Sequence, residues 1–233
     1  MKDLVTKGAE HFGIHIDETT AEKFDLYYKS VVSYNEKVNL TAITDETEFC
    51  VKHFLDSIAA AKFLPENAKL VDVGSGAGFP AVPLKLIRGD LSVTMIDALG
   101  KRVTFLNSVT EELGLKDIRA IHLRAEDAAK GELRESFDVV TARAVSELRT
   151  LAEYCLPLVK IGGRFVSYKS ANSDEEIKAA ENAIKILGGT IEKIDDFCLP
   201  ISGEKRRLVI IKKIAATPKK YPRGQGKEKK QPL

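Results

Sequence analysis

The N-terminal part of the chain repeats apolar side chains at helical spacing. Residues 17–39 and 45–64 each place apolar positions three and four apart, which is the period of one face of an α-helix. The positions are Phe24, Tyr27, Tyr28, Val31 and Val32 in the first segment, and Phe49, His53, Leu55, Ile58 and Ala61 in the second. We expect two helices, capped by Thr19 or Thr20 and by Thr44 or Asp45, with the NLTAI segment at 39–43 between them.

From residue 69 onward, short apolar runs alternate with amphipathic segments. The runs expected to form strands are 69–74, 92–97, 118–123, 137–142, 163–169, 190–198 and 206–213. Helices are expected at 80–88, 101–113, 146–159 and 173–187, with at most a short helix after the third strand. Repeated strand–helix units predict an α/β fold with a doubly wound, mostly parallel sheet. Because no helix separates the last two strands, an antiparallel C-terminal hairpin should complete seven strands.

A glycine-rich turn follows the first of these strands, in LVDVGSGAGFP at residues 70–80. Gly74, Gly76 and Gly78 allow the backbone to turn tightly and to approach a ligand, because glycine has no Cβ. Pro80 suits the first position of the helix that follows. Strand, glycine turn and helix form the first unit of nucleotide-binding folds. The alternative is a turn that only joins the strand to the helix.

The spacing of the glycines bears on the cofactor. A dinucleotide fingerprint, GxGxxG, would place its third glycine at residue 79, but the chain has Phe79 there and Gly78 one position earlier. The resulting DxGxGxG pattern, which begins at Asp72, is usual for Rossmann-like class I methyltransferases that bind S-adenosylmethionine. An NAD(P)-dependent oxidoreductase is the rival class of enzyme.

Polar side chains at the ends of later strands are candidates for binding, because ligands of open α/β sheets lie at the carboxyl ends of the strands. Asp97, after the second strand, is placed to bind ribose hydroxyls, a feature that both cofactor classes share. Glu126, or alternatively Asp127, could accept from the adenine amino group. Arg143 lies in an apolar run and should bind the methionine carboxylate or pair with a structural acid. Tyr168 and Lys169, at the end of the fifth strand, could contact the substrate.

Two motifs that methyltransferases use are missing from the end of the fourth strand. It has no Asn/Asp-Pro-Pro-aromatic sequence, which holds exocyclic amines, and no Pro-Cys pair, which attacks cytosine. The expected acceptor is therefore already nucleophilic. Guanine N7 has a free lone pair and no proton to remove, so its methylation requires alignment rather than a strong base.

Composition narrows the class of protein further. The 233 residues are 44% hydrophobic, enough for one α/β domain with an accessory segment, and no run reaches the length of a membrane span. The N-terminus has charges but no apolar signal core, and the three cysteines lack metal-ligand spacing, so we expect a cytoplasmic protein with buried, reduced cysteines and no metal. The cysteines are Cys50, Cys155 and Cys198.

Charge is concentrated at the C-terminus. The whole chain has a net charge of +2, whereas residues 214–233 contain six Lys or Arg and a single Glu. The segment is rich in Pro, Gly and Lys and is expected to be flexible. It could contact nucleic-acid phosphates or serve as a solubilising terminus.

Several of these motifs, taken in order, resemble the bacterial rRNA small-subunit methyltransferase G family (RsmG, also called GidB). The matching segments are NLTAI, KHFLDSI at 52–58, VDVGSGAGFPAVPLKL, IDALGKRVTFL at 96–106, RAED, VTARAV and TPKKYPR at 217–223. The resemblance implies methyl transfer from S-adenosylmethionine to guanine N7 of 16S rRNA, on naked rRNA, an assembly intermediate or the small ribosomal subunit. It also implies cofactor contacts at Gly74, Phe79, Asp97, Ala98, Leu99, Ala125, Glu126 and Arg143.

The expected organisation is a helical extension at 1–66, a methyltransferase domain at 67–214 and a basic tail at 215–233, in a monomer without membrane contact. His53 and Asp56 share one helix face and could hold the target guanine, order the rim of the site, or form a structural polar pair. Lys101 and Arg102 could bind RNA phosphate or be a solvated face. A non-catalytic RNA-binding protein with a vestigial cofactor pocket remains a further alternative.

Overall fold

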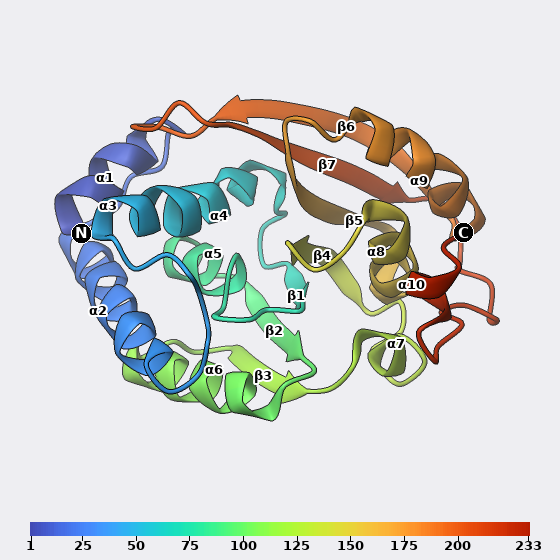
Figure 1. Ribbon diagram of the computed structural model, residues 1–233, viewed down its shortest axis with the longest axis horizontal. Coiled ribbons are helices and arrows are strands. Elements are labelled where there is room, and N and C mark those ends of the chain that lie inside the picture. The colour runs from blue at the N-terminus through green and yellow to red at the C-terminus, as the bar shows by residue number, and fades with distance from the viewer.

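A single seven-stranded sheet runs through the computed structural model, which describes all 233 residues (Figure 1). Its strands are β1 (Lys69–Val73), β2 (Ser92–Asp97), β3 (Ile118–His122), β4 (Phe137–Arg143), β5 (Val159–Ser170), β6 (Gly189–Cys198) and β7 (Lys205–Lys213). They lie in the order β3-β2-β1-β4-β5-β7-β6. Strands β1 to β5 pair in parallel, whereas β7 is antiparallel to both β5 and β6. The predicted α/β sheet with an antiparallel C-terminal hairpin is confirmed.

Each central strand supplies side chains to two separate hydrophobic cores, one on each face of the sheet. Consecutive residues of a strand point to opposite faces. Leu70 and Ile210 therefore belong to a cluster of 37 buried residues, while Val71 and Ile211 belong to one of 23 on the other face. Burial on both faces explains why these strands read as continuous apolar runs in the sequence.

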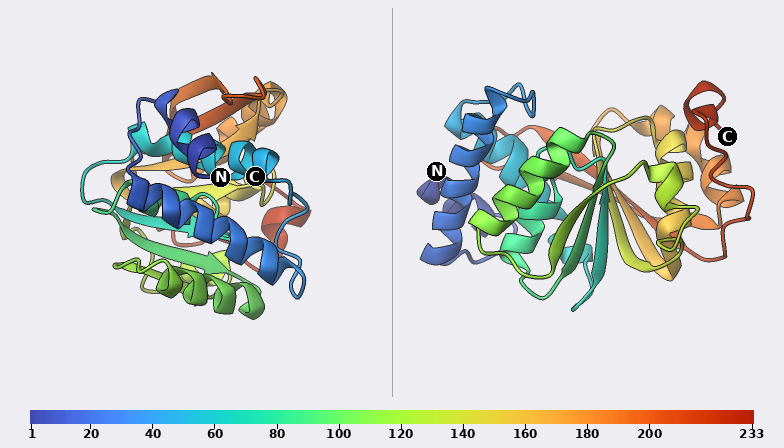
Figure 2. Two further views of the ribbon diagram at one scale, coloured as in Figure 1. Left: turned by 90° about the vertical axis from the view of Figure 1, so that its left-hand side faces the viewer. Right: turned by 90° about the horizontal axis from the view of Figure 1, so that it is seen from below.

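The N-terminal helices, together with α5 and α6, cover the first face and share its core (Figure 2). These helices are α1 (Lys2–Glu10), α2 (Glu18–Asn35), α3 (Glu46–Phe49), the π-helix η1 (Cys50–Leu55), α4 (Asp56–Ile58), the 3₁₀ helix η2 (Ala59–Phe63), α5 (Ala81–Ile87) and α6 (Gly100–Glu112). Phe24 and Phe54 are fully buried in the same cluster as Leu70 of the sheet. The helical extension expected at 1–66 is therefore packed as a layer of the fold.

The ends and the regularity of these helices differ in detail from the sequence prediction. Asp17, rather than Thr19 or Thr20, caps α2, because its carboxylate accepts from the Thr20 amide at 2.7 Å. Asp45 caps α3 as expected, accepting from the Glu48 amide at 2.9 Å. The single helix expected over 45–64 is interrupted by the π-helical η1. Such turns are frequent at functional sites.

The second face is covered by α7 (Ala125–Ala128), α8 (Leu148–Cys155), the 3₁₀ helix η3 (Leu156–Leu158), α9 (Asp174–Ile186) and the C-terminal segment with α10 (Lys227–Lys230). The segment expected to be flexible lies against the body of the protein in this structure (Figure 1). Tyr221 is 6% exposed, and Arg134 donates to the carbonyls of Thr217 and Tyr221 at 2.8 and 2.9 Å. Composition reflects the many lysines of the segment but not these few contacts, which fix its position.

Two cysteines are buried as expected, but the third is not. Cys50 and Cys155 are fully buried, whereas Cys198 is exposed because it ends β6, a strand at the edge of the sheet. All three are free thiols. No group of three or more His, Cys, Asp or Glu side chains is placed to hold a metal ion. None of the helices combines the length and the apolar character needed to cross a membrane.

Candidate active site at the carboxyl edge of the sheet

The glycine turn joins β1 to α5 and is held to β2 by backbone hydrogen bonds. The amides of Gly74 and Ser75 donate to the Ile96 carbonyl at 2.8 and 3.2 Å. All three glycines have left-handed φ angles, which are +72° at Gly74, +58° at Gly76 and +103° at Gly78. Residues with a Cβ rarely adopt this conformation, so the predicted tight turn is confirmed.

The three glycines nevertheless face different neighbours. A Cβ on Gly74 would lie 2.7 Å from a methyl carbon of Val145, and one on Gly78 would lie 2.6 Å from the Tyr27 hydroxyl oxygen. A Cβ on Gly76 would meet only a backbone oxygen, at 4.0 Å. We expected all three glycines to let the backbone turn tightly and approach a ligand. In the structure, protein atoms fill the space beside two of them, and Gly76 alone faces open space.

Asp97 lies beside Gly76 and holds the turn from the end of β2. Its Oδ2 accepts from the Gly76 amide at 2.9 Å, and its Oδ1 accepts from the Leu99 amide at 2.9 Å. Each carboxylate oxygen can accept a second hydrogen bond, so both remain able to bind a ribose hydroxyl. Leu99 is 54% exposed at the rim of the turn, and the Ala98 carbonyl lies 3.0 Å from Nε2 of His122.

The short helix α7 brings Ala125 and Glu126 to the same edge of the sheet, after β3. The Glu126 side chain is 16% exposed, and its nearest cation is Arg124 at 3.9 Å. Asp127, the alternative partner for adenine, is exposed to solvent. A half-buried carboxylate with no close partner is better placed to accept from a ligand than a solvated one, and Glu126 stays the preferred prediction.

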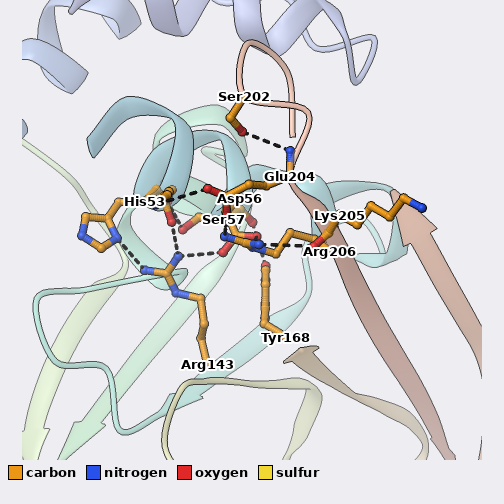
Figure 3. Close-up of polar contacts among 10 residues, drawn as sticks. His53, Asp56, Ser57, Arg143, Tyr168, Ser202, Glu204, Lys205 and Arg206 are labelled. Carbon is orange, nitrogen blue, oxygen red and sulfur yellow. Dashed lines mark hydrogen bonds and ion pairs between the residues drawn. The ribbon is translucent and has the colours of Figure 1, made fainter. Parts of the chain in front are cut away.

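Arg143 extends from the end of β4 toward the N-terminal helices (Figure 3). Its Nη1 donates to Oδ2 of Asp56 and to the carbonyl of Lys52, both at 2.9 Å, and its Nη2 lies 3.3 Å from Nδ1 of His53. The pairing with a structural acid, one of the two roles considered for Arg143, is therefore formed. Arginine has five N–H donors, so the Nε hydrogen and one Nη2 hydrogen remain for a ligand.

His53 is held on both of its ring nitrogens. Nε2 lies 2.8 Å from the Thr41 hydroxyl, and the ring stacks on Phe79 with centroids 4.5 Å apart. Burial, and then the charge of Arg143, lower the pKa of His53 to about 3. A neutral ring accepts from Arg143 at Nδ1 and donates to Thr41 from Nε2, which is the tautomer that these partners require. His53 thus has no free nitrogen with which to act as a base.

A hollow of about 410 Å³ lies between η1 and the ends of β4, β5 and β7. Its lining includes the side chains of Lys52, His53, Asp56, Arg143, Lys169 and Arg206. Asp56 bridges two of the cations, because its Oδ1 lies 3.7 Å from Nε of Arg206 while its Oδ2 binds Arg143. Four cations and one buried carboxylate therefore line the hollow, while Glu48, Glu176 and Glu204 pair with three of the cations from outside its lining.

The residues expected to contact the substrate separate into two locations. Lys169 lines the hollow, where it donates to the Ser146 carbonyl at 3.0 Å and to Glu176 at 2.6 Å. Lys101 and Arg102 begin α6, beside Asp97 rather than in the hollow; Lys101 is exposed, and Nη1 of Arg102 lies 3.7 Å from Oδ2 of Asp97.

Two tyrosines and an arginine contribute to the site in ways that sequence reasoning missed. The Tyr27 hydroxyl donates to the Ala77 carbonyl in the glycine turn at 2.6 Å, and the Tyr168 hydroxyl donates to the Ser57 carbonyl at 2.7 Å. Arg206, at the start of β7, reaches Asp56 (Figure 3). The sequence pattern marks Tyr27 only as an apolar position of a helix. It gives no indication that Arg206 belongs to the site, because Asp56, its partner, is 150 residues away in the sequence.

Asp72, the acidic residue of the glycine motif, is completely buried below the turn. Its Oδ1 accepts from the Thr141 hydroxyl at 2.8 Å, whereas its Oδ2 has no hydrogen-bond partner. Burial raises the pKa of Asp72 to about 7, an effect that the hydrogen bonds from Ser75 and Thr141 only partly offset. The native fold therefore favours the protonated form of this carboxyl group more than the unfolded chain does.

Comparison with known proteins places this geometry in context. A family model described as GidB, rRNA small subunit methyltransferase G, matches residues 20–208. A ribosomal RNA small subunit methyltransferase G from Acetivibrio thermocellus is 46% identical over 235 positions, covering 100% of this chain and 97% of the relative. Its counterpart from Staphylococcus epidermidis is 48% identical over 223 positions, covering 95% and 93%.

Solved structures show the same fold at much lower sequence identity. A SAM-dependent methyltransferase from Aquifex aeolicus superposes with a TM-score of 0.54 at 20% identity, covering 72% of this chain and 93% of that one. The TYW2 protein of M. jannaschii, solved in complex with AdoMet, gives 0.56 at 16% identity, covering 68% and 75%. These likenesses support the Rossmann-like methyltransferase fold.

Removing the Tyr27 hydroxyl should loosen the glycine turn. Tyr27→Phe leaves the buried Ala77 carbonyl without its donor, and the free energy of unfolding should fall by about 1–3 kcal/mol. Tyr28→Phe is the matched control, since the Tyr28 hydroxyl donates to the Thr44 carbonyl in an exposed position. Urea unfolding measures both variants. Equal losses of stability would contradict the special role of Tyr27.

Replacing Asp72 should change how stability depends on pH. The pKa of Asp72 is raised to about 7 in the fold from an unfolded value near 4, so the native state binds the extra proton and stability falls as pH rises between these values. Asp72→Asn should therefore increase the melting temperature at pH 8 more than at pH 4.5. Thermal unfolding across this range tests it, and an equal shift at both pH values would show that Asp72 does not titrate there.

Proposed function

The chain belongs to the rRNA small subunit methyltransferase G family, and we propose that it transfers a methyl group from S-adenosylmethionine to N7 of a guanine in 16S rRNA. The observation that carries this proposal is the position of Arg143. The same side chain lines the charged hollow and lies at the strand edge that carries the glycine turn. A methyl donor at the glycine turn and an acceptor in the hollow would therefore both contact this residue.

The residues at the glycine turn fit S-adenosylmethionine. Gly76 leaves open space where a side chain would otherwise project, and Asp97 keeps an acceptor site on each carboxylate oxygen for the two ribose hydroxyls. Glu126 would accept from the adenine amino group beside Leu99 and Ala98. The two unused donors of Arg143 would bind the methionine carboxylate. When bound, the cofactor supplies an electrophilic methyl group on a positively charged sulfur.

The side chains around the reaction centre would align the reactants rather than move protons. Guanine N7 attacks with its lone pair and loses no proton, so no general base is required. The engaged nitrogens of His53 agree with this requirement. His53 and Asp56 therefore act as positioning residues, which hold the guanidinium of Arg143 over the Phe79 ring, 5.1 Å from its centroid.

The hollow has the polarity that a guanine nucleotide needs. Guanine presents N–H donors on N1 and N2 and an acceptor at O6, while its phosphate is negative. Asp56 shares the lining of the hollow with Lys52, Lys169 and Arg206, and Arg206 lies 3.7 Å from its carboxylate. Lys169 has used two of its three ammonium hydrogens, leaving one for O6 or for a phosphate.

Two alternative functions make different predictions. The position of Asp97 alone would also suit an NAD(P)-dependent oxidoreductase, but the family to which the chain belongs is one of methyltransferases. A non-catalytic RNA-binding protein would bind the cofactor without turnover.

We further propose that the enzyme works in the cytoplasm as a monomer, on rRNA that is naked or assembled with ribosomal proteins.

The direct test is methylation of 16S rRNA by the purified protein. Unmodified 16S rRNA or small subunits are incubated with isotopically labelled S-adenosylmethionine, and mass spectrometry of nuclease digests should detect 7-methylguanosine. Cofactor binding without any labelled nucleoside would favour the non-catalytic alternative. Label on a different base or a different atom would contradict the N7 assignment.

Lys169→Gln tests the acceptor side of the site. Loss of this cation from the hollow should lower kcat/KM for rRNA by about tenfold, or about 1.4 kcal/mol, and should leave the Kd for S-adenosylmethionine unchanged. Lys160→Gln is the matched control, because Lys160 lies at the other end of β5 and pairs with Asp138. Equal activity of the two variants would show that Lys169 does not contribute to the acceptor site.

A further inference from the structure

The C-terminal segment presents its lysines from a backbone that is fixed to the protein. Lys219, Lys220, Lys227, Lys229 and Lys230 are all exposed, while Tyr221, between them in sequence, is buried in the core of the second face. Lys130, also exposed, extends this group, and its Nζ lies 3.4 Å from the Arg223 carbonyl. We call these six residues the lysine surface.

A buried carboxylate anchors the segment to α8. Glu153 has no exposed surface, and its Oε1 accepts from the backbone amide of Arg223 at 2.8 Å and from the Arg223 Nε at 2.9 Å. Its Oε2 accepts from Nη2 at 2.7 Å. Removing a carboxylate from water is unfavourable unless such partners are present. Glu153 thus depends on the docked position of the segment.

A second buried acid closes the segment on itself. Glu228, in α10, is fully buried, and its Oε1 accepts from the Gly224 amide. The Glu228 carbonyl also accepts from the Thr150 hydroxyl at 3.1 Å. Thr150 belongs to the first turn of α8, so α10 is joined to the body of the protein at the start of that helix.

At α10, the lysine surface reaches the edge of the sheet that carries the proposed active site, whereas Lys219 and Lys220 flank a part of the segment that Arg134 binds, before the start of β4. Helix α8 begins five residues after Arg143, and α10 packs against it (Figure 1). Tyr221 packs in the same core as Ala128 of α7, the helix that holds the predicted adenine contacts. A long polyanion bound at the active site would therefore reach the lysines of α10 first and could continue along the segment toward Lys219 and Lys220.

We propose that the docked C-terminal segment is a preformed phosphate-binding surface for the rRNA strand that flanks the target guanine. This inference rests on the proposed function. Lysines are the side chains that neutralise RNA phosphates, and each contact makes the affinity depend on salt. Fixing their backbone before binding removes an ordering cost that a flexible tail would incur on the RNA.

Glu153→Gln separates docking from charge, because the two predict opposite results. The substitution removes one negative charge, so charge alone predicts tighter RNA binding. It also weakens the anchor of Arg223, so the docking proposal predicts a Kd for naked 16S rRNA that is about 3- to 10-fold higher. Hydrogen exchange at the amides of residues 219–230 reports whether the segment has loosened. Tighter binding by a variant with a loosened segment would overturn the proposal.

Neutralising the lysines tests the surface itself. With the five tail lysines changed to Gln, the slope of log Kd against log salt for 16S rRNA should fall by about 0.7–0.9 for each lysine that meets a phosphate. The control changes five exposed lysines on other parts of the protein to Gln, namely Lys7, Lys37, Lys116, Lys178 and Lys185. An equal loss of slope in both variants would show that only net charge matters and would overturn the proposal.

Failure of this proposal and failure of the proposed function give different results. If the wild-type protein methylates 16S rRNA and the five-lysine variant keeps the wild-type salt slope, the enzyme assignment stands and the lysine surface is wrong. If anionic phosphatidylglycerol vesicles bind the wild-type protein more tightly than 16S rRNA does, and the same five substitutions abolish that binding, the surface serves a membrane and the proposal is also wrong. Absence of methylation by the wild-type protein contradicts the function itself.

Discussion

Close packing of the N-terminal helices on the glycine turn is the constraint on which the site depends. Phe79 is 7% exposed and lies where the two meet, with the His53 ring stacked on it and the Arg143 guanidinium above it. Tyr27 fills the space beside Gly78 and binds the turn through Ala77. A methyltransferase sheet alone would present a loop at this place. The helices pack against that loop and hold it in place, so that only the position beside Gly76 stays open.

Arg143 connects the packed N-terminal helices to both sides of the site. Its contacts with Lys52, His53 and Asp56 use three of its five N–H donors and fix the orientation of the guanidinium group. The two unused N–H groups are therefore held in a fixed orientation as well. A guanidinium held in this way loses little entropy when it binds a carboxylate, which favours a preorganised site. The same ion pair places Asp56 among the cations of the hollow, so the donor side and the acceptor side share one network.

The fold buries charged groups at the C-terminal segment, and two of them, Lys213 and Glu153, have several hydrogen-bond partners there. The ammonium of Lys213 donates to the Leu156 carbonyl and the Thr217 hydroxyl at the point where the C-terminal segment leaves β7. Glu153 holds the same segment farther along through Arg223. Burial of such groups is unfavourable unless their partners are in place. Together they give the segment one defined position beside α7 and α8, which its composition alone would not predict.

Most of the fold could be predicted from the sequence because its signals are local. Seven apolar runs, the helical spacing between them and the missing helix before the last strand determined the sheet and its antiparallel end. The one-position difference between Gly78 and Phe79 determined the cofactor class. These features depend on backbone sterics and on burial, which act over a few residues. The shared location of the candidate residues at one edge was predictable for the same reason, since parallel strands bring their carboxyl ends together.

Only the tertiary structure decided how these residues are used. Arg143 meets Asp56 across 87 positions of sequence, Tyr27 meets Ala77 across 50, and Arg223 meets Glu153 across 70. No local pattern encodes such pairs, because they form between side chains that the packing of separate layers brings together. Hence the sequence by itself identified the sheet, the methyl-donor motif and the strand ends. The packing of helices and tail decided which glycine is open, which donors are free and where the lysines face.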